Sequence, residues 1–184
     1  TGKELIAQIA QNYLPQGTPF FKINCASLNG DTAHSDLFGH EKGSFTGAWN
    51  KKEGLFKKAN GGWIFFDEIA RLSYNMQAAL LRVLEDGEIR PVGSLTIQKV
   101  SVKIIAATNE NLTELINKNL FRQDLLQRLQ TFEIHLPPLR QRSNSEKKEI
   151  LNFLLISQNK SKLQDHFKNF SLSNEVEKLL LTYS

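Results

Sequence analysis

The fold is decided by the stretch GGWIFFDE, residues 61–68, in which four consecutive apolar side chains lead directly into two carboxylates. Continuous rather than alternating apolar character is typical of a parallel strand that is covered on both faces. We therefore expect residues 63–68 to form a buried strand, with Asp67 and Glu68 at its carboxyl end.

Similar patterns extend outward from this strand in both directions. Apolar runs predict further strands at 20–25, 102–109 and 131–136, and residues 89–92 and 95–100 read as a hairpin joined through Gly93-Ser94. Helical spacing predicts helices at 5–14, 76–84, 112–116 and 124–129. Alternating helices and buried strands indicate a doubly wound α/β sheet, whose ligands bind at the carboxyl ends of the strands.

The character of the sequence changes after residue 142. Residues 146–156 and 172–181 have helical patterns, and a Lys- and Asn-rich segment separates them. We expect two domains: an α/β nucleotide-binding core at 1–142 and the start of a small helical lid at 143–184.

Composition bounds the class of protein. The 184 residues carry a net charge of +4 that is spread along the chain, and they include one cysteine. A disulfide framework and a cysteine-based metal site are therefore excluded, and the four histidines show no metal-ligand spacing. The sequence contains no apolar run long enough to span a bilayer and no DNA-binding motif spacing. We expect a cytoplasmic protein without a membrane partner.

The Gly2-Lys3 pair, which precedes a predicted helix, resembles the end of a phosphate-binding loop. Backbone N–H groups and the helix dipole would bind phosphate, and Lys3 would reach its terminal oxygens. Such a pair also occurs by chance, the upstream glycines are absent, and Glu4 stands where the general motif has Ser or Thr. The pair alone therefore leaves nucleotide binding open.

Asp67 and Glu68 carry more information. Hydrolysis of a nucleotide needs one carboxylate to hold Mg²⁺ and another to orient or deprotonate the attacking water. The alternative is a solvated strand end or a helix N-cap. Lys3 favours the catalytic interpretation, because a phosphate loop and strand-end carboxylates meet at the same sheet edge.

Three further polar residues have plausible structural explanations. Asn109 ends a predicted strand and could lie beside a γ-phosphate, or it could be a turn residue. Arg122 and Arg128 could be offered to a transferred phosphoryl group, or they could be solvated positions on an amphipathic helix. These residues become candidates only through their context.

Together these segments resemble the central AAA+ ATPase domain of bacterial enhancer-binding proteins, the activators of sigma-54 RNA polymerase. The most specific match is GSFTGA, residues 43–48, which is similar to that family's signature loop Gly-Ala-Phe-Thr-Gly-Ala. The other matches keep the family's order: TGKE (1–4), INCASL (23–28), DLFGHEKGSFTGA (36–48), GGWIFFDEI (61–69), LLRVLEDGEIRPVGS (80–94), IIAATN (104–109), FRQDLLQRL (121–129) and LPPLRQR (136–142).

The resemblance implies an ATPase that uses ATP and Mg²⁺. Asp67 would organise the metal through ATP, and Glu68 would activate water. Asn24 would hold Glu68 in an inactive pose, and Asn109 would sense the γ-phosphate. Residues implied to bind the nucleotide are Thr1, Gly2, Lys3 and Glu4. Arg122 and Arg128 would be arginine fingers that complete the site of a neighbouring subunit in a ring, expected to be a hexamer.

The resemblance also gives the signature loop a partner. ATP turnover would lift the loop against sigma-54, supported by the hairpin around Gly93. Glycine hinges permit two backbone states, and Phe45 and Thr46 would make the contact. Ser44 replaces the family's usual alanine, and its effect on the loop is open. The implied partner-binding residues are Gly43, Ser44, Phe45, Thr46, Gly47 and Ala48.

The implied function of the parent protein is to remodel sigma-54 RNA polymerase and drive open-complex formation. DNA would be bound only through a C-terminal domain outside this sequence. The sequence lacks the upstream part of the phosphate loop and the lid arginine, so this fragment is expected to hydrolyse ATP poorly or not at all. The alternatives are a AAA+ ATPase with another protein client, and a nucleotide-binding module without turnover.

Overall fold

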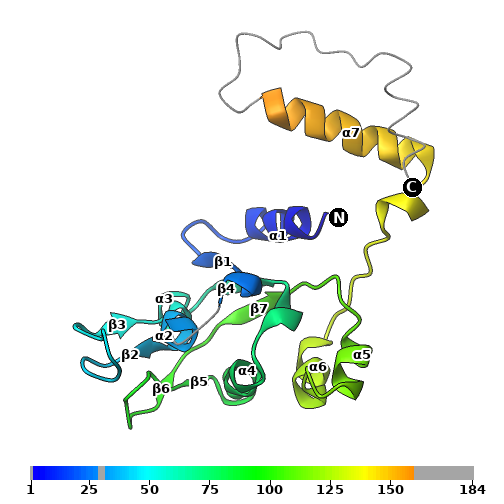
Figure 1. Cartoon of the computed structure of the whole chain (residues 1–184). Helices are drawn as coiled ribbons and strands as arrows, with labels where there is room; N and C mark the ends of the chain where they lie inside the picture. The colour runs from blue at the N-terminus through cyan, green and yellow to red at the C-terminus, as the bar shows by residue number, and fades with distance from the viewer. Residues whose placement is uncertain (1, 29–31, 160–184) are drawn as a thin grey trace. The chain divides into compact units, whose positions relative to one another are not determined.

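A parallel three-stranded sheet forms the centre of the chain. The computed structural model describes residues 2–28 and 32–159, with side chains described up to residue 153. Its strands lie in the order β1 (Phe20–Asn24), β4 (Trp63–Asp67) and β7 (Lys103–Ala106) (Figure 1). Because all three run parallel and in register, their carboxyl ends meet at one edge of the sheet.

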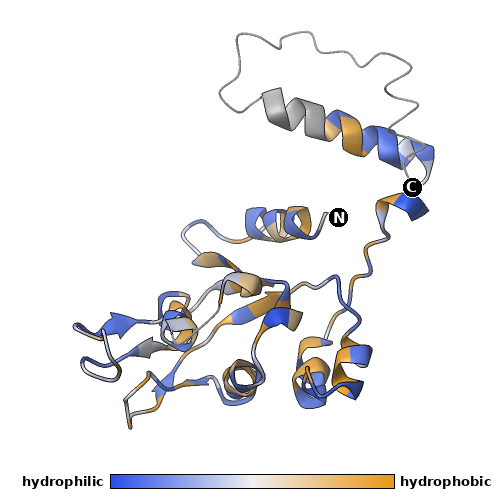
Figure 2. Ribbon diagram, viewed as in Figure 1, coloured by the Kyte–Doolittle hydropathy of each residue, from blue (hydrophilic) through white to orange (hydrophobic). Residues whose placement is uncertain are grey.

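The middle strand is the buried strand that the sequence predicts. Ile64 and Phe66 are fully buried and Phe65 is 2% exposed, so both faces of β4 are covered. Figure 2 shows the outlying β3 in the hydrophilic colour. Burial on both faces explains why apolar residues continue along β4 instead of alternating.

Helices cover the two sides of this sheet. Figure 1 shows α1 (Lys3–Asn12) on one side and α4 (Tyr74–Asp86) on the other. Ser73 caps α4 by accepting a hydrogen bond from the Met76 N–H, and Gly87 ends the helix in the left-handed region, where glycine is favoured. After β7 come α5 (Leu112–Asn117) and α6 (Gln123–Leu129), and α6 contacts α4. The predicted doubly wound α/β fold and its four helices are confirmed.

Two short hairpins extend from this core. The first pairs β2 (Gly39–His40) with β3 (Lys52–Glu53), and the second pairs β5 (Glu88–Ile89) with β6 (Gln98–Lys99). The predicted hairpin at 89–100 is therefore confirmed, although its strands are shorter than expected. The first hairpin is flanked by α2 (Thr32–Phe38) and α3 (Leu55–Lys58), which the sequence did not predict.

The strand predicted at 131–136 is wrong for this structure. The segment is irregular, and Phe132 and Ile134 are 91% and 70% exposed. A strand needs a hydrogen-bonded neighbour, and among the described residues β7, the outer strand of the sheet, pairs only with β4. Residues 131–136 have the alternating pattern of a strand, but no described strand lies beside them to pair with.

Contacts between residues divide the chain into two compact units, and the second unit begins at His135. Its described elements are the 3-10 turn η3 (Leu139–Gln141) and α7 (Asn144–Asn159). The helix predicted at 146–156 is confirmed within α7, whereas the one predicted at 172–181 lies outside the described residues. The boundary expected after residue 142 stays a prediction. None of the helices described is both long and apolar enough to cross a membrane.

Candidate functional site

The carboxyl edge of the sheet gathers polar side chains from neighbouring strands. Asn24 at the end of β1 lies opposite Asp67 at the end of β4. Glu68 follows with a φ of 53°, in the left-handed region, and its N–H donates to Asp67 Oδ1 at 3.0 Å. A non-glycine residue in this region is uncommon and is concentrated at functional sites.

Asn24 has a local role as well as its place beside Asp67. Its Oδ1 accepts a hydrogen bond from the Ala26 N–H at 2.8 Å, and its backbone oxygen accepts one from Ser27 Oγ at 2.7 Å. These bonds cap the short turn η1 (Cys25–Ser27). The structure therefore brings Asn24 to the carboxylates but uses its amide oxygen to shape the turn that follows β1.

The pKa of Cys25 is affected by the negative charge at this edge. Burial, the largest cause, and the negative charges of Asp67 and Glu68 together raise the pKa of its thiol from 9.0 to about 12. Both the desolvation and the like charge disfavour a thiolate. Cys25 is therefore a buried neutral neighbour of the two carboxylates.

The N-terminus of α1 suits an anion. Gly2 has a φ of 90° and precedes Lys3, the first helical residue, and no side chain caps the helix. The first N–H groups of the helix can therefore point to an external acceptor, aided by the helix dipole. Glu4 lies 4.0 Å from Lys22 of β1, which places the start of α1 near the sheet. Thr1 lies outside the described residues.

This donor set fits a nucleotide phosphate better than a metal held by protein alone. The described part of the chain has no group of three or more His, Cys, Asp or Glu side chains that could hold a metal ion. A carboxylate such as Asp67 suits Mg²⁺ when phosphate oxygens complete the coordination. A metal at this edge would therefore depend on a bound nucleotide.

Asn109 lies three residues beyond β7 and is exposed. The chain just before it is tied to the β4 end, because the Ala107 N–H donates to Phe66 O at 2.8 Å and Ala107 O accepts from the Ile69 N–H at 3.0 Å. These bonds place the segment leading to Asn109 next to the turn that carries Glu68.

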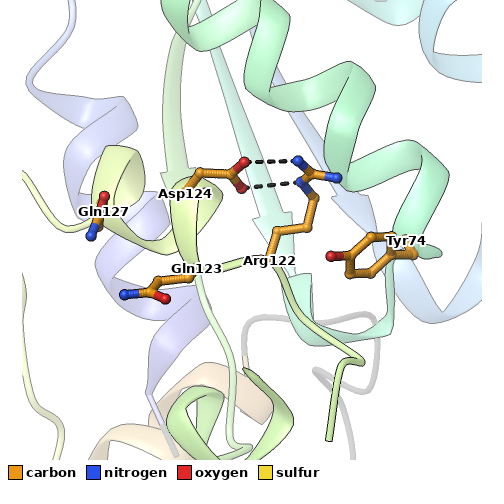
Figure 3. A pocket seen from close by; sticks show the side chains of 5 residues that line it. All are labelled: Tyr74, Arg122, Gln123, Asp124 and Gln127. Atoms are coloured by element: carbon orange, nitrogen blue, oxygen red, sulfur yellow. Dashed lines mark hydrogen bonds and ion pairs between the residues drawn. The ribbon is translucent and has the colours of Figure 1, made fainter. Parts of the chain in front are cut away.

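Arg122 and Arg128 pair with carboxylates other than Asp67 and Glu68. Arg122 makes a bidentate pair with Asp124, with Nε and Nη2 donating at 3.0 and 2.8 Å, and its guanidinium lies 5.1 Å from the centre of the Tyr74 ring (Figure 3). The pair raises the pKa of Arg122 and lowers the pKa of Asp124. Arg128 lies 3.7 Å from Glu85. The described ion pairs thus join neither arginine to Asp67 or Glu68.

Arg122 also borders an open hollow of about 360 Å³. Figure 3 shows its guanidinium between Tyr74 and Asp124, which places the charge at the surface in a defined position. The residues lining this hollow are Tyr74, Arg122, Gln123, Asp124 and Gln127.

The glycine-rich segment 41–51 forms the tip of the β2–β3 hairpin. The Gly43 N–H donates to Ala48 O at 2.8 Å, and the Ala48 N–H donates to Phe45 O at 3.0 Å. Gly43 and Gly47 have φ angles of 79° and 99°, which favour glycine. Thr46 is exposed and Ala48 is buried, so the loop is a compact turn with one polar side chain at its end.

His40 anchors this loop. One ring nitrogen contacts Ser35 Oγ at 2.6 Å, and the other donates to Asn50 O at 2.8 Å. Phe45 packs its ring against His40 edge-on, with 5.0 Å between the ring centres. Phe45 is therefore half-buried in this state, and the neighbouring Trp49 is 80% exposed.

The two hairpins lie against each other through Ser44. The Glu41 N–H donates to Val92 O at 3.0 Å, and a methyl group added at Gly93 would lie 2.5 Å from Ser44 Cβ. The Ser44 hydroxyl is buried there without a hydrogen-bond partner. The predicted proximity of the signature loop and the hairpin around Gly93 is confirmed.

Comparison with known sequences identifies the family. The sigma-54 interaction domain matches residues 1–135, which include the sheet and both hairpins. The chain belongs to this family. Its relatives include the Nif-specific regulatory protein of Enterobacter agglomerans, which is 44% identical over 100% of this chain and 35% of its own length. The DNA-binding transcriptional regulator NtrC of Escherichia coli strain K12 is 43% identical over 85% of this chain and 34% of its own length.

Solved structures agree with this assignment. NtrX from Brucella abortus in complex with ADP has a TM-score of 0.86 at 28% identity, covering 100% of this chain and 39% of NtrX. NtrX was also solved in complex with ATP, with a TM-score of 0.84 at 28% identity, covering 100% of this chain and 40% of NtrX. The chain therefore spans about a third of the length of the curated relatives and two fifths of NtrX.

Sequence reasoning missed several residues that shape this sigma-54 interaction domain. It assigned no chemistry to His40, whose contacts with Ser35 and Phe45 appear only in three dimensions. It also missed Gln77, a polar residue on the buried face of α4. An amide at the i position of an apolar i, i+3, i+4, i+7 stripe is a signal that could have found it.

Proposed function

We propose that the chain is the ATP-hydrolysing part of a transcriptional activator that remodels sigma-54 RNA polymerase and drives open-complex formation. One observation carries the proposal: Asn24, Asp67 and Glu68 meet at the carboxyl edge of the sheet, with the uncapped α1 N-terminus beginning at Gly2-Lys3. Membership of the sigma-54 interaction domain family supports the partner, and the ADP and ATP complexes of NtrX support the nucleotide.

In this proposal each residue has a physical task. The N–H groups of α1 and Lys3 hold the phosphates, together with Thr1, Gly2 and Glu4 at the loop. Asp67 orients Mg²⁺, which neutralises developing phosphate charge when it is bound with ATP. Glu68 orients and deprotonates water, Asn24 restrains Glu68, and Asn109 reads the γ-phosphate.

The arginines complete the site from outside. Arg122, the N-cap residue of α6, is partly exposed, and Arg128 on α6 is exposed; their described ion pairs are with Asp124 and Glu85, so both arginines can serve another copy of the chain. Charge delivered in trans requires a ring, proposed to be a hexamer. Contact with DNA belongs to a separate C-terminal domain in this proposal.

The loop at 43–48 is the part proposed to press on sigma-54. Thr46 is exposed in the described state, whereas Phe45 rests on His40. Lifting the loop would release Phe45 from this contact and expose an apolar side chain to the partner. Nucleotide turnover would supply the free energy for the exchange.

Glu68→Gln tests turnover. The amide keeps the shape of the side chain but cannot take a proton, so we expect ATP hydrolysis in the full-length protein to fall by about a hundredfold or more. Equilibrium binding of ATP should change little, because Lys3 and the α1 N-terminus remain. An unchanged rate of phosphate release would favour a nucleotide-binding module without turnover.

Thr46→Ala tests the partner. We expect the substitution to leave ATP hydrolysis intact and to abolish sigma-54 binding and open-complex formation in a reconstituted transcription assay. Thr96→Ala, an exposed threonine on the neighbouring hairpin, serves as the matched control. Undiminished transcription with Thr46→Ala would point to another protein client.

A further inference from the structure

Gln77 is a fully buried polar residue that joins segments far apart in the sequence. Its Nε2 donates to Leu72 O at 2.8 Å and to Leu120 O at 3.0 Å. Its Oε1 accepts a hydrogen bond from the Arg122 backbone N–H at 2.9 Å. Both ends of this amide are therefore used, as burial of a polar group requires.

These bonds fix the position of the Arg122 backbone. The residue between the two contacts, Phe121, is 1% exposed, and Leu125 on the first turn of α6 is fully buried. Arg122 is the N-cap residue of α6, and its N–H would otherwise point into this core without a partner. The start of α6 is thus held by the amide of Gln77 and by the apolar anchors on either side of Arg122.

Tyr74 lies one helical turn before Gln77 on α4, so the two side chains share a face. The guanidinium of Arg122 lies 5.1 Å from the centre of the Tyr74 ring, within the range of a cation–π contact. Figure 3 shows Arg122 between Tyr74 and Asp124. One face of α4 therefore contacts both the backbone and the charged end of Arg122.

The same face of α4 also contacts the segment that follows the carboxyl edge of the sheet. Leu72, whose carbonyl accepts from Gln77, follows the turn η2 (Ile69–Arg71) directly after Asp67 and Glu68. The Nε2 of Gln77 thus contacts the segment that follows Asp67 and Glu68, and its Oε1 contacts the backbone of Arg122.

We propose that Tyr74 and Gln77 are positioning residues that present Arg122 to a phosphate bound by a second copy of this chain. The inference rests on the proposed trans role of Arg122. Asp124 keeps the guanidinium paired while no phosphate is present, and a phosphoryl group with similar oxygen geometry replaces the carboxylate in the assembled ring. Gln77 acts on the backbone of Arg122 and Tyr74 acts on its side chain.

Mixing of variant subunits tests this proposal in the full-length protein. A Gln77→Met subunit retains Lys3, Asp67 and Glu68 but presents Arg122 poorly. A Glu68→Gln subunit cannot hydrolyse ATP but presents Arg122 correctly. We expect each alone to be at least tenfold less active than the wild type, with ATP affinity of Gln77→Met within about twofold of the wild type. Mixing them should raise the ATPase rate several-fold, because intact arginines then complete intact sites.

Two controls separate the possible failures. Arg122→Ala mixed with Glu68→Gln is the benchmark, and an absence of recovery there would refute the trans role of Arg122 itself. Recovery with Arg122→Ala but none with Gln77→Met would overturn the positioning role and leave the proposed function standing. Leu80→Ala, which truncates a fully buried residue of the same helix, should lower thermal stability and show no recovery on mixing.

Tyr74→Leu tests the same proposal without changing a buried residue. Tyr74 is 46% exposed, so the variant should fold even where Gln77→Met does not. We expect a reduced maximal rate, unchanged ATP affinity and recovery on mixing with Glu68→Gln. Wild-type activity of Tyr74→Leu together with failed recovery of Gln77→Met, including failure because it does not fold, would overturn the proposal.

Discussion

At the scale of single residues, the pKa of Cys25 responds to Asp67 and Glu68 at the carboxyl edge of the sheet, although Cys25 has no part in the proposed chemistry. Its thiol is buried next to Asp67 and Glu68, and these surroundings raise its pKa to about 12. A raised pKa means that the folded state holds the proton more tightly than the unfolded state. The associated stability is present below the ordinary value of 9.0 and declines as the pH rises from there towards about 12.

This shift predicts that Cys25 resists alkylation in the folded protein. At pH 8 the thiolate fraction should be about a thousandfold lower than in the unfolded chain, because only the thiolate reacts and the pKa differs by about three units. Iodoacetamide labelling followed by mass spectrometry measures the rate with and without denaturant. Asp67→Asn removes one of the two negative charges and should raise the rate. Rapid labelling of the native protein would contradict the described burial.

At the scale of elements, the contact between the two hairpins depends on Ser44 and Gly93. Any side chain at Gly93 would collide with Ser44 Cβ, and the φ of 77° at Gly93 also favours glycine. The Ser44 hydroxyl gains no hydrogen bond in this packed state. Because a buried hydroxyl without a partner costs free energy, we expect Ser44 to weaken the packing between the two hairpins relative to the alanine typical of the family loop.

Ser44→Ala is expected to stabilise the protein by about 1 kcal/mol, because it removes a buried hydroxyl that has no partner. Ser35→Ala is the matched comparison: Ser35 is also buried, but its hydroxyl bonds to His40, so its loss should destabilise the protein by a similar amount. Denaturant midpoints measure both effects. Destabilisation by Ser44→Ala would show that the hydroxyl has a partner in solution.

Elements differed in how far the sequence could predict them. The strand at 63–67 and the helix at 74–86 were predictable, because burial on both faces or on one face leaves a local pattern. The β2–β3 stem has only two residues per strand, too few for a pattern, and depends on close contact between Gly39 and Gly54. The strand predicted at 131–136 required a distant partner that a local pattern cannot reveal.

Site residues followed the same division. Asp67 and Glu68 could be predicted because a strand end and two carboxylates are adjacent in the sequence. The contact between Gln77 and Arg122 joins residues 45 positions apart and could not be predicted from spacing. The placement of Phe45 on His40 was also not predictable, because a glycine-rich loop permits several backbone paths.

At the scale of the whole molecule, the catalytic edge and the arginines belong to different parts of one chain. Asp67 ends β4 and Glu68 follows it, whereas Arg122 caps α6 and Arg128 lies on it, each with a carboxylate partner of its own. If the proposed roles of these residues hold, phosphoryl transfer needs a positive charge that another copy of the chain supplies. Activity is therefore expected to depend on assembly.

We predict that the ATPase rate per protomer of the full-length protein rises with protein concentration and reaches a plateau once rings have formed. Dilution assays combined with sedimentation measure the rate and the assembly state together. Arg122→Ala should assemble but remain at least about a hundredfold below the wild-type plateau. A constant rate per protomer, down to concentrations at which sedimentation finds monomers, would contradict a shared site.

Trp49 gives the loop a built-in optical signal. Its indole is 80% exposed directly after the glycine-rich segment, whereas Trp63, the second of the two tryptophans in the chain, lies in β4 beneath the ammonium group of Lys103. Replacing Trp63 with Phe would leave Trp49 as the one tryptophan in these 184 residues, next to the loop that is proposed to move. Its emission would then follow the transfer of the loop from water to a protein surface in real time, without an added label.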